Sequence, residues 1–266
     1  MATTRAKRRE LADYDRPPVI EVVYGVKFTP LKGWMLPHIG AFWQQVASDF
    51  PRCEHAPPIG DPDAIDLATG LPLPRVWLIS GADDRLIQLQ SGRFLFNWRH
   101  REGAGRYPRY DTLSKTFFRH LLDFERFTAK HGLGAMEVRE YELTYINHVL
   151  DQDGWKFPED IGRVVDQLAW QDQRHRFLPR PLTMGWQAKF TFQDAPGALL
   201  VKINPAANVR DQRQLLVMEL SARGLPAEAT RDHMEDWFSH AHGWIVRGFE
   251  DLTSDEAQRE LWGKHE

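Results

Sequence analysis

The sequence predicts an α+β protein whose strands form one curved antiparallel sheet, with the helices on one face. Two observations predict this class. Short β-branched and aromatic runs bounded by turn residues occur in groups, which is typical of antiparallel strands. Between and after these groups, apolar residues recur at helical spacing. The series strand, helix, three strands, helix occurs twice in the 266 residues, so we expect two related β-α-β-β-β-α halves.

The first half opens with a β-branched and aromatic run at Val19–Phe28, which we expect to be a central strand. Apolar side chains at helical spacing between Met35 and Val46 predict an amphipathic helix. Residues 51–74 are rich in Pro, Asp and Gly, and this composition predicts a long exposed loop.

A meander and a long helix complete this half. Short apolar runs separated by turn residues predict strands at 76–80, 86–90 and 94–98. The apolar positions between Asp111 and Lys130 then define a helix, with Asp111 expected as its N-cap and Gly132 as its stop.

The second half repeats this order with little residue identity. A strand is expected within Met136–Val149, and the following Gly154-Trp155 matches the Gly33-Trp34 corner of the first half. The remaining expected elements are a helix at 158–168, strands at 186–192, 199–204 and 215–220, and a long helix at 230–249.

These elements set the expected organisation of the chain. A disordered basic tail (1–16) precedes the two halves (17–135 and 136–251), and a short C-terminal helix or tail (252–266) follows them. If the two meanders join into one sheet, the architecture resembles the TATA-binding-protein-like or helix-grip arrangement, in which a saddle or groove accepts a ligand. That analogy concerns the fold and carries little information about function.

Composition restricts the classes of function. The chain is 42% hydrophobic and long enough to bury a sizeable core, so its stability requires neither a metal nor a cofactor, and we expect none. The single cysteine, Cys53, and the absence of a long apolar run favour a reducing cytoplasmic location without a membrane segment. The net charge of −3 argues against nucleic acid as the main partner, although Arg5, Lys7, Arg8 and Arg9 form a short basic run.

The best candidate site is a segment that combines arginines with aromatic residues between positions 93 and 110. Guanidinium groups bind phosphate or carboxylate through paired hydrogen bonds, and aromatic faces can stack on rings. Solvated arginines on a strand followed by an anchoring loop would explain the same pattern. The candidate ligand-binding residues are Arg93, Asn97, Trp98, Arg99, Arg101, Arg106, Tyr107, Arg109 and Tyr110.

Two further groups are secondary candidates. Arg174, Arg176 and Arg180 lie in an irregular connector, where solvated linker residues are an equally good explanation. On the strand expected before Val149, alternation places Glu142 and His148 on one face and Asn147 on the other. Such a mixture of polar and apolar residues suits a ligand-facing sheet and an exposed sheet almost equally.

Motifs for catalysis are missing from the chain. It contains no nucleophile elbow, P-loop or dinucleotide-binding glycine pattern. Cys53 and His55 lie in the expected loop without an evident third group to orient them. His233, His240 and His242 lack the spacing of a zinc site, so no metal ligand is assigned.

Three stretches together resemble a sporadically distributed bacterial family of uncharacterised proteins. They are Pro17-Pro18-Val19-Ile20-Glu21-Val22-Val23, then Phe96-Asn97-Trp98 with Tyr107-Pro108-Arg109-Tyr110, and then Phe249-Glu250-Asp251-Leu252-Thr253 with Trp262-Gly263. The resemblance spans nearly the whole chain and brings no established catalytic or binding residues. It implies a patchy, mobile-gene type of distribution, which is associated with defence or toxin–antitoxin functions.

Three hypotheses follow. The first is a non-enzymatic protein that binds an anionic small molecule or a protein partner through a sheet groove and the arginine–aromatic segment. The second is an enzyme with an unrecognised site acting on a phosphorylated or carboxylated substrate. The third is a nucleic-acid-binding regulator. Leu261 and Trp262 could anchor back on the body or dock on a second subunit, so a homodimer is left open.

Overall fold

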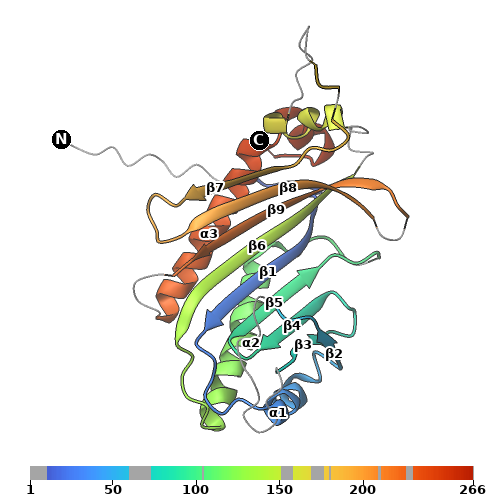
Figure 1. Ribbon diagram of the computed structural model, residues 1–266. Helices are drawn as coiled ribbons and strands as arrows, with labels where there is room; N and C mark the ends of the chain where they lie inside the picture. The colour runs from blue at the N-terminus through green and yellow to red at the C-terminus, as the bar shows by residue number, and fades with distance from the viewer. Residues whose placement is uncertain are drawn as a thin grey trace, which may run out of the picture.

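A single twisted sheet of nine antiparallel strands organises the molecule (Figure 1). The computed structural model describes residues 11–59, 73–103, 105–150, 158–168, 177–179, 181–208, 211–225 and 230–265. The strand order is β2-β3-β4-β5-β1-β6-β9-β8-β7. Their bounds are β1 Val19–Phe28, β2 Arg52–Ala56, β3 Arg75–Ile79, β4 Arg85–Gln90, β5 Arg93–Arg99, β6 Val138–Leu150, β7 Trp186–Thr191, β8 Ala198–Ala207 and β9 Gln214–Gly224.

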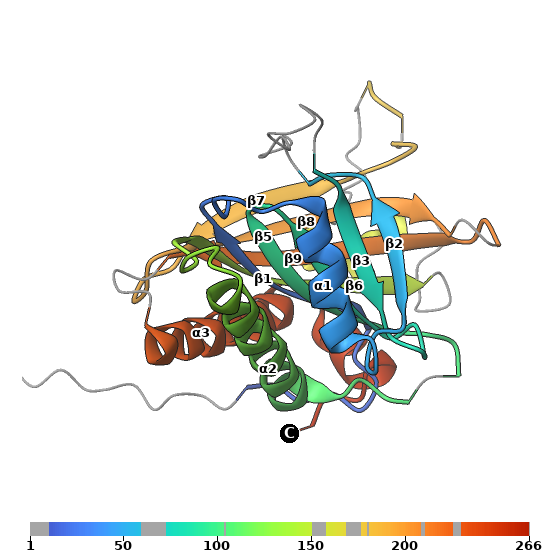
Figure 2. The ribbon, with the colours of Figure 1, turned by 90° about the horizontal axis from the view of Figure 1, so that it is seen from below.

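In the part of the chain that the structure describes, the α-helices all lie on one face of this sheet (Figure 2). The α-helices are α1 Leu36–Val46, α2 Arg109–Lys130 and α3 Arg231–Leu252. We call the face under them the helix face and the opposite one the open face. The core lies on the helix face, where aromatic side chains of β1 and β5 meet those of α2 and α3; Tyr24, for example, stacks on Phe117 and contacts Phe238. The predicted α+β class is confirmed.

The two parts of the chain meet at the antiparallel pair β1–β6 in the middle of the sheet. β1 lies there as expected, with nearly every second residue buried. On one side the order β3-β4-β5-β1 places the first strand beside the last strand of its meander, and on the other side β7-β8-β9-β6 does the same. Both predicted meanders are found. The strands expected at 76–80, 86–90 and 94–98 are β3–β5, and those expected at 186–192, 199–204 and 215–220 are β7–β9.

Several predicted elements differ from the structure. The expected loop at 51–74 contains β2, an exposed edge strand that pairs with β3, and its residues 60–72 lie outside the described part of the chain. The helix expected at 158–168 consists of two 3₁₀ segments, η2 Pro158–Arg163 and η3 Asp166–Leu168. Asp111 is not the N-cap of α2, because the helix begins two residues earlier and Asp111 lies in its first turn.

The ends of the chain also differ from the prediction. Residues 1–10 and the Gly154-Trp155 corner lie outside the described residues, but Tyr14 is 5% exposed and forms a β-bridge with Lys264. The packed part of the chain therefore begins before the expected boundary at residue 17. At the other end α3 continues to Leu252, and the short helix expected afterwards is the π-helical turn η4 Ala257–Leu261.

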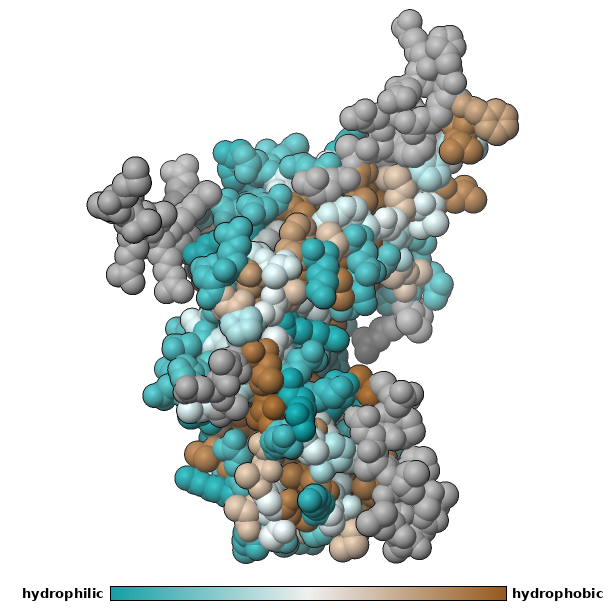
Figure 3. Space-filling model, turned by 60° about the vertical axis from the view of Figure 1, so that its left-hand side comes forward, coloured by the Kyte–Doolittle hydropathy of each residue, from teal (hydrophilic) through white to brown (hydrophobic). Residues whose placement is uncertain are grey.

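The surface combines hydrophilic residues with a few hydrophobic ones (Figure 3). The most exposed large apolar side chains are Phe177 and Leu182, at 97% and 98%, just before β7. Such side chains contribute no burial energy to the fold. Among the described residues, no helix combines the length and apolar character needed to cross a membrane.

Candidate functional site

The predicted arginine–aromatic segment divides between the two faces of the sheet. Side chains of β5 alternate, so Arg93, Asn97 and Arg99 lie on the open face. Trp98 points to the helix face, where its ring is 5.2 Å from that of Tyr107. The nine candidate residues therefore cannot form one site.

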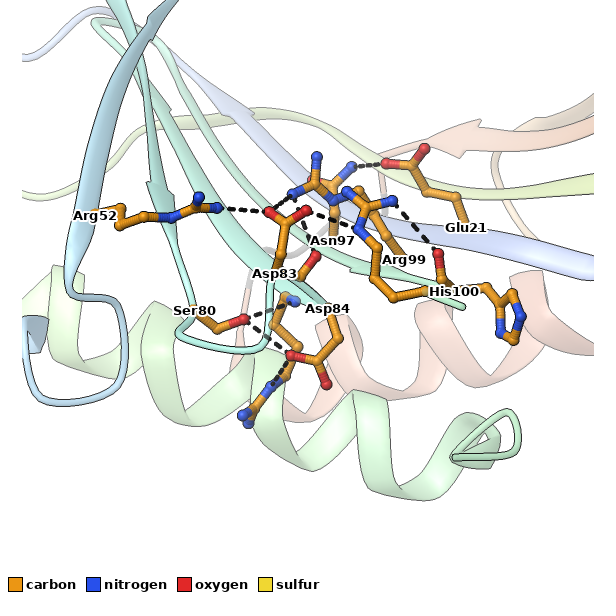
Figure 4. Close-up of polar contacts among 10 residues, drawn as sticks. Glu21, Arg52, Ser80, Asp83, Asp84, Asn97, Arg99 and His100 are labelled. Atoms are coloured by element: carbon orange, nitrogen blue, oxygen red, sulfur yellow. Dashed lines mark hydrogen bonds and ion pairs between the residues drawn. The ribbon is translucent and has the colours of Figure 1, made fainter. Parts of the chain in front are cut away.

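The open-face members close to the β3–β4 turn belong to an ion-pair cluster around Asp83 (Figure 4). Arg52, Arg99 and Arg101 each place a guanidinium nitrogen 2.8 Å from the Asp83 carboxylate. Burial raises the pKa of Asp83, but the three guanidinium groups outweigh that effect and hold it below its ordinary value. Arg99 and Arg101 thus fasten a turn in which Asp83 has a left-handed φ of 59°.

Asn97 belongs to a hydrogen-bonded chain that crosses the open face from β3 to β1. The Trp77 indole donates to Gln88 at 3.1 Å, Gln88 donates to Asn97 at 2.7 Å, and Asn97 donates to Glu21 at 2.6 Å. Burial raises the pKa of Glu21, and the hydrogen bond from Asn97 opposes that rise. Because its partners are all supplied by the sheet, we assign Asn97 a structural role.

The helix face contains a cavity of about 500 Å³, which we call the tyrosine–histidine cavity. It lies where the start of α2, the middle of α3, strand β6 and the N-terminal segment 11–19 meet. The described residues that line it are Leu11, Ala12, Asp13, Tyr14, Pro17, Pro18, Val19, Tyr107, Arg109, Tyr110, Asp111, Tyr145, Asn147, Leu220, Ser239, His242, Ile245, Val246 and Phe249. Four of them, Tyr107, Arg109, Tyr110 and Asn147, are residues that the sequence singled out.

A hydrogen-bonded chain runs along the wall of this cavity. The hydroxyls of Tyr107 and Tyr145 are 3.0 Å apart, and the Tyr145 hydroxyl is 3.1 Å from Nδ1 of His242. The Tyr110 ring stacks on the imidazole of His242 with centroids 4.2 Å apart and planes at 8°. Side chains from β6, α2 and α3 are thereby fixed relative to one another.

The electrostatics of the cavity keep these groups uncharged. Burial raises the pKa of Tyr107 and of Tyr110 to about 12, and it raises the pKa of Tyr145 as well. Burial lowers the pKa of His242 to about 4. Near neutral pH the tyrosines are therefore protonated and the histidine is neutral, so these four side chains are uncharged hydrogen-bonding groups.

Arg109 and the N-terminal segment form the edge of the cavity. The Arg109 guanidinium contacts the Asp13 carboxylate and donates to the Tyr14 carbonyl oxygen at 3.0 Å. Arg109 has a φ of 67°, which is uncommon for a residue with a side chain and marks sites where the surroundings impose the backbone. Arg106 is exposed nearby and contributes to lowering the pKa of Asp15, after the larger effects of His265.

The secondary candidate residues also lie in different parts of the structure. Asn147 reaches the cavity, whereas Glu142 lies on the open face 3.3 Å from Arg223, and the pKa of His148 is lowered by burial. Arg174, Arg176 and Arg180 lie outside the described residues.

Sequence reasoning missed the role of His242, which it weighed as a metal ligand. Its aromatic partners Tyr110 and Tyr145 come from other elements, so no local signal connects them. In the described part of the chain, no group of three or more His, Cys, Asp or Glu side chains is placed to hold a metal ion.

Comparison with protein-family models and with curated proteins found no match to this chain.

Proposed function

We propose that this chain is a non-enzymatic binding protein and that a small molecule occupies the tyrosine–histidine cavity. The observation that carries the proposal is a cavity of about 500 Å³ with an apolar wall and a few convergent polar groups. Ligand sites in proteins are clefts of roughly 300–1,000 Å³ with the same balance of lining. The left-handed Arg109 at its edge adds support, because imposed backbone conformations cluster at functional sites.

The lining also indicates the chemistry of the ligand. Val19, Leu220 and Ile245 provide an apolar wall for a hydrocarbon or a ring. Tyr107 and Asn147 provide hydrogen-bonding groups at the β6 side. Since the charged residues of the lining are two carboxylates and one arginine already paired with Asp13, the ligand that fits best is a neutral, ring-bearing molecule with a hydroxyl or carbonyl group.

The pKa values favour binding over acid–base catalysis. A general acid or base at neutral pH works best with a pKa near 7. Burial shifts the pKa of Tyr107 and of His242 in the opposite directions, to about 12 and about 4. This is why the enzyme hypothesis ranks second here.

Two broader expectations belong to the same proposal. The matching strand orders on either side of the β1–β6 pair support descent of the two halves from one duplicated unit, with a saddle-like sheet as in the TATA-binding-protein-like or helix-grip arrangement. A mobile defence or toxin–antitoxin context, and a cytoplasmic location, remain expectations from the sequence.

The proposal is tested by titration with N-phenylnaphthylamine, a neutral dye whose fluorescence rises in apolar surroundings, together with native mass spectrometry of gently purified protein. We expect saturable binding of one dye per chain and displacement of the dye by any co-purified small molecule. Absence of saturable dye binding by folded protein would contradict the proposal.

A matched pair of variants localises the site. Val246 lines the cavity from α3 and is partly buried, so Val246→Trp should fill it and weaken dye binding by about tenfold or more. Asp236→Trp places the same ring on an exposed part of α3 outside the cavity and should leave binding unchanged. Should Val246→Trp fail to fold, Ser239→Trp at an exposed lining position gives the same test.

A further inference from the structure

A row of cationic side chains crosses the open face at the end away from Asp83. Arg93 of β5 pairs directly with Gln90 of β4 and with Lys27 of β1. Arg75 of β3 precedes Val76, which faces the core with its partner Leu89, so Arg75 lies on the open face beside Gln90. We call Lys27, Arg75 and Arg93 the cation row.

These three side chains lack the carboxylate partners that the neighbouring arginines have. Within the described residues, Lys27, Arg75 and Arg93 form no ion pair, whereas three arginines surround Asp83. Glu140 lies opposite Lys27 on β6 without forming an ion pair with it. In the described part of the chain, no ion pair therefore compensates the positive charge of the cation row.

Two of the guanidinium groups also bury an unsatisfied donor. Nε of Arg75 and Nε of Arg93 are inaccessible to solvent and have no hydrogen-bond partner among the residues that the structure describes. A buried N–H without an acceptor costs roughly 1–3 kcal/mol, and such groups in folded proteins call for an ion or water. The Gln90 side chain pairs instead with the Ile59 backbone: its oxygen accepts from the Ile59 amide at 3.1 Å, and its nitrogen donates to the Ile59 carbonyl oxygen at 3.5 Å.

The arrangement of the row is unfavourable for the sheet itself. Arg93 and Lys27 are like charges directly opposite each other on neighbouring strands, a pairing that destabilises antiparallel sheets. Arg75 is held in position by Trp77, with its guanidinium carbon 5.5 Å from the ring centroid. Local arrangements that destabilise the fold without an evident structural gain are typical of functional sites.

We propose that the cation row binds a phosphate group carried by a small molecule. A phosphate offers several acceptor oxygens, accepts paired hydrogen bonds from guanidinium groups and compensates the charge of Lys27. Neighbouring strands are about 5 Å apart, so the backbone of Arg93 is about 5 Å from that of Lys27 on β1 and about 10 Å from that of Arg75, across β4. Extended arginine and lysine side chains are long enough to reach one anion from these positions. This site lies on the opposite face of the sheet from the tyrosine–histidine cavity and does not depend on it.

The experiment is isothermal titration calorimetry of the full chain at low ionic strength with orthophosphate, phenyl phosphate and acetate. We expect one saturable site for a phosphate, weakened by added salt. Tighter binding of phenyl phosphate than of orthophosphate is expected for a phosphate carried by a small molecule, and binding of orthophosphate alone would overturn that ligand in favour of the free ion. Acetate binding as tight as that of phosphate, or no saturable binding of either phosphate, would overturn the proposal.

Variants assign the site. Arg93→Gln and Arg75→Gln should each weaken phosphate binding by about ten- to a hundredfold, because each removes a charged donor. Arg259→Gln removes one exposed arginine from η4 and should leave phosphate binding unchanged. Equal weakening by all three substitutions would contradict a defined site. Folding is checked by the thermal midpoint without ligand, and added phosphate should raise the midpoint less in Arg93→Gln than in the wild type.

Discussion

Two tyrosine hydroxyl groups on the helix face of β6 differ in their hydrogen bonds. Tyr145 and Tyr141 lie on the same face of this strand, and both are buried. The Tyr145 hydroxyl is the middle member of the chain from Tyr107 to His242. The Tyr141 hydroxyl is buried and has no hydrogen-bond partner among the described residues. Comparing the two residues therefore measures what a hydrogen-bonded hydroxyl contributes to stability.

We predict that Tyr145→Phe lowers the free energy of unfolding by about 1–3 kcal/mol, because Tyr107 and His242 both lose a buried partner. Tyr141→Phe removes a hydroxyl that has no partner and should be neutral or stabilising. Urea denaturation of both variants checks this. Equal losses of unfolding free energy in the two variants would show that the hydrogen bonds from Tyr107 to His242 add no specific stability.

Two histidines with lowered pKa values predict how stability changes with pH. Burial lowers the pKa of His120 and of His242 to about 4, from an ordinary value near 6.5. Since the folded pKa is the lower one, the unfolded chain binds more protons as the pH falls from about 6.5 to about 4. Stability is complete above this window and is lost within it, by about 2 kcal/mol per histidine at pH 4.5.

The contribution of His120 can be isolated by substitution. Its ring lies 5.1 Å from that of Phe50, and its side chain is 2% exposed, so His120→Phe places an uncharged ring in an aromatic environment. We expect the loss of unfolding free energy between pH 7 and pH 4.5 to be about 2 kcal/mol smaller in this variant. Since carboxylates titrate in both proteins, the difference between them is the quantity to measure. An unchanged pH dependence would contradict the assignment.

At the scale of elements, close backbone contacts decide where strands can end. Gly224 is the last residue of β9 and lies against the turn between β7 and β8. A Cβ at this position would collide with the Pro196 carbonyl oxygen and would lie 2.8 Å from Cα of Gly197. The same carbonyl accepts a hydrogen bond from the Trp237 indole at 3.0 Å, which connects the turn to α3. A glycine therefore allows β9, this turn and the helix to meet.

We predict that Gly224→Ala lowers the free energy of unfolding by about 1–3 kcal/mol, because the backbone contacts cannot move aside as a flexible side chain could. Gly81→Ala is the matched control, since a Cβ there would meet nothing within 4 Å. Thermal unfolding of both variants measures the difference. A Gly224→Ala protein as stable as Gly81→Ala would show that the turn relaxes freely.

At the scale of the whole molecule, the two ends of the chain close the tyrosine–histidine cavity. Backbone amides of Asp15 and Arg16 donate to the carbonyl oxygens of Gly263 and Trp262, each at 3.1 Å. Trp262 is 3% exposed, and its ring is 4.9 Å from that of Phe249, which lines the cavity. The N-terminal wall of the cavity thus depends on a segment almost 250 residues away.

We predict that Trp262→Ala destabilises the protein by about 3–5 kcal/mol and accelerates hydrogen exchange of the amides in segment 11–19. The increase should exceed that in the central strand β1, because the segment loses its anchor whereas β1 keeps both neighbouring strands. Hydrogen exchange followed by mass spectrometry measures both regions. A uniform increase across the chain would mean that the ends do not form a separate closing unit.

Much of the fold could be predicted because its signals are local. The β-branched run of β1 and the apolar spacing of α2 are properties of consecutive residues, and alternation along β6 correctly separated Glu142 from Asn147. Strand β2 was missed because an exposed edge strand has no buried face and so leaves no alternating pattern. The 3₁₀ segments at 158–168 were expected as one helix, since short apolar spacing does not distinguish the two.

The candidate site could be predicted from the sequence only in part. By itself the sequence determined the α+β class and the residue types present between Arg93 and Tyr110, because these depend on neighbouring positions. The tertiary structure decided that Tyr107 meets Tyr145 and His242, which are 38 and 135 residues further along the chain. It also decided that Arg93 and Trp98 lie on opposite faces of the sheet and that Arg101 is held by Asp83. The physical reason is that convergence depends on strand order and register, which long-range packing of the whole core sets.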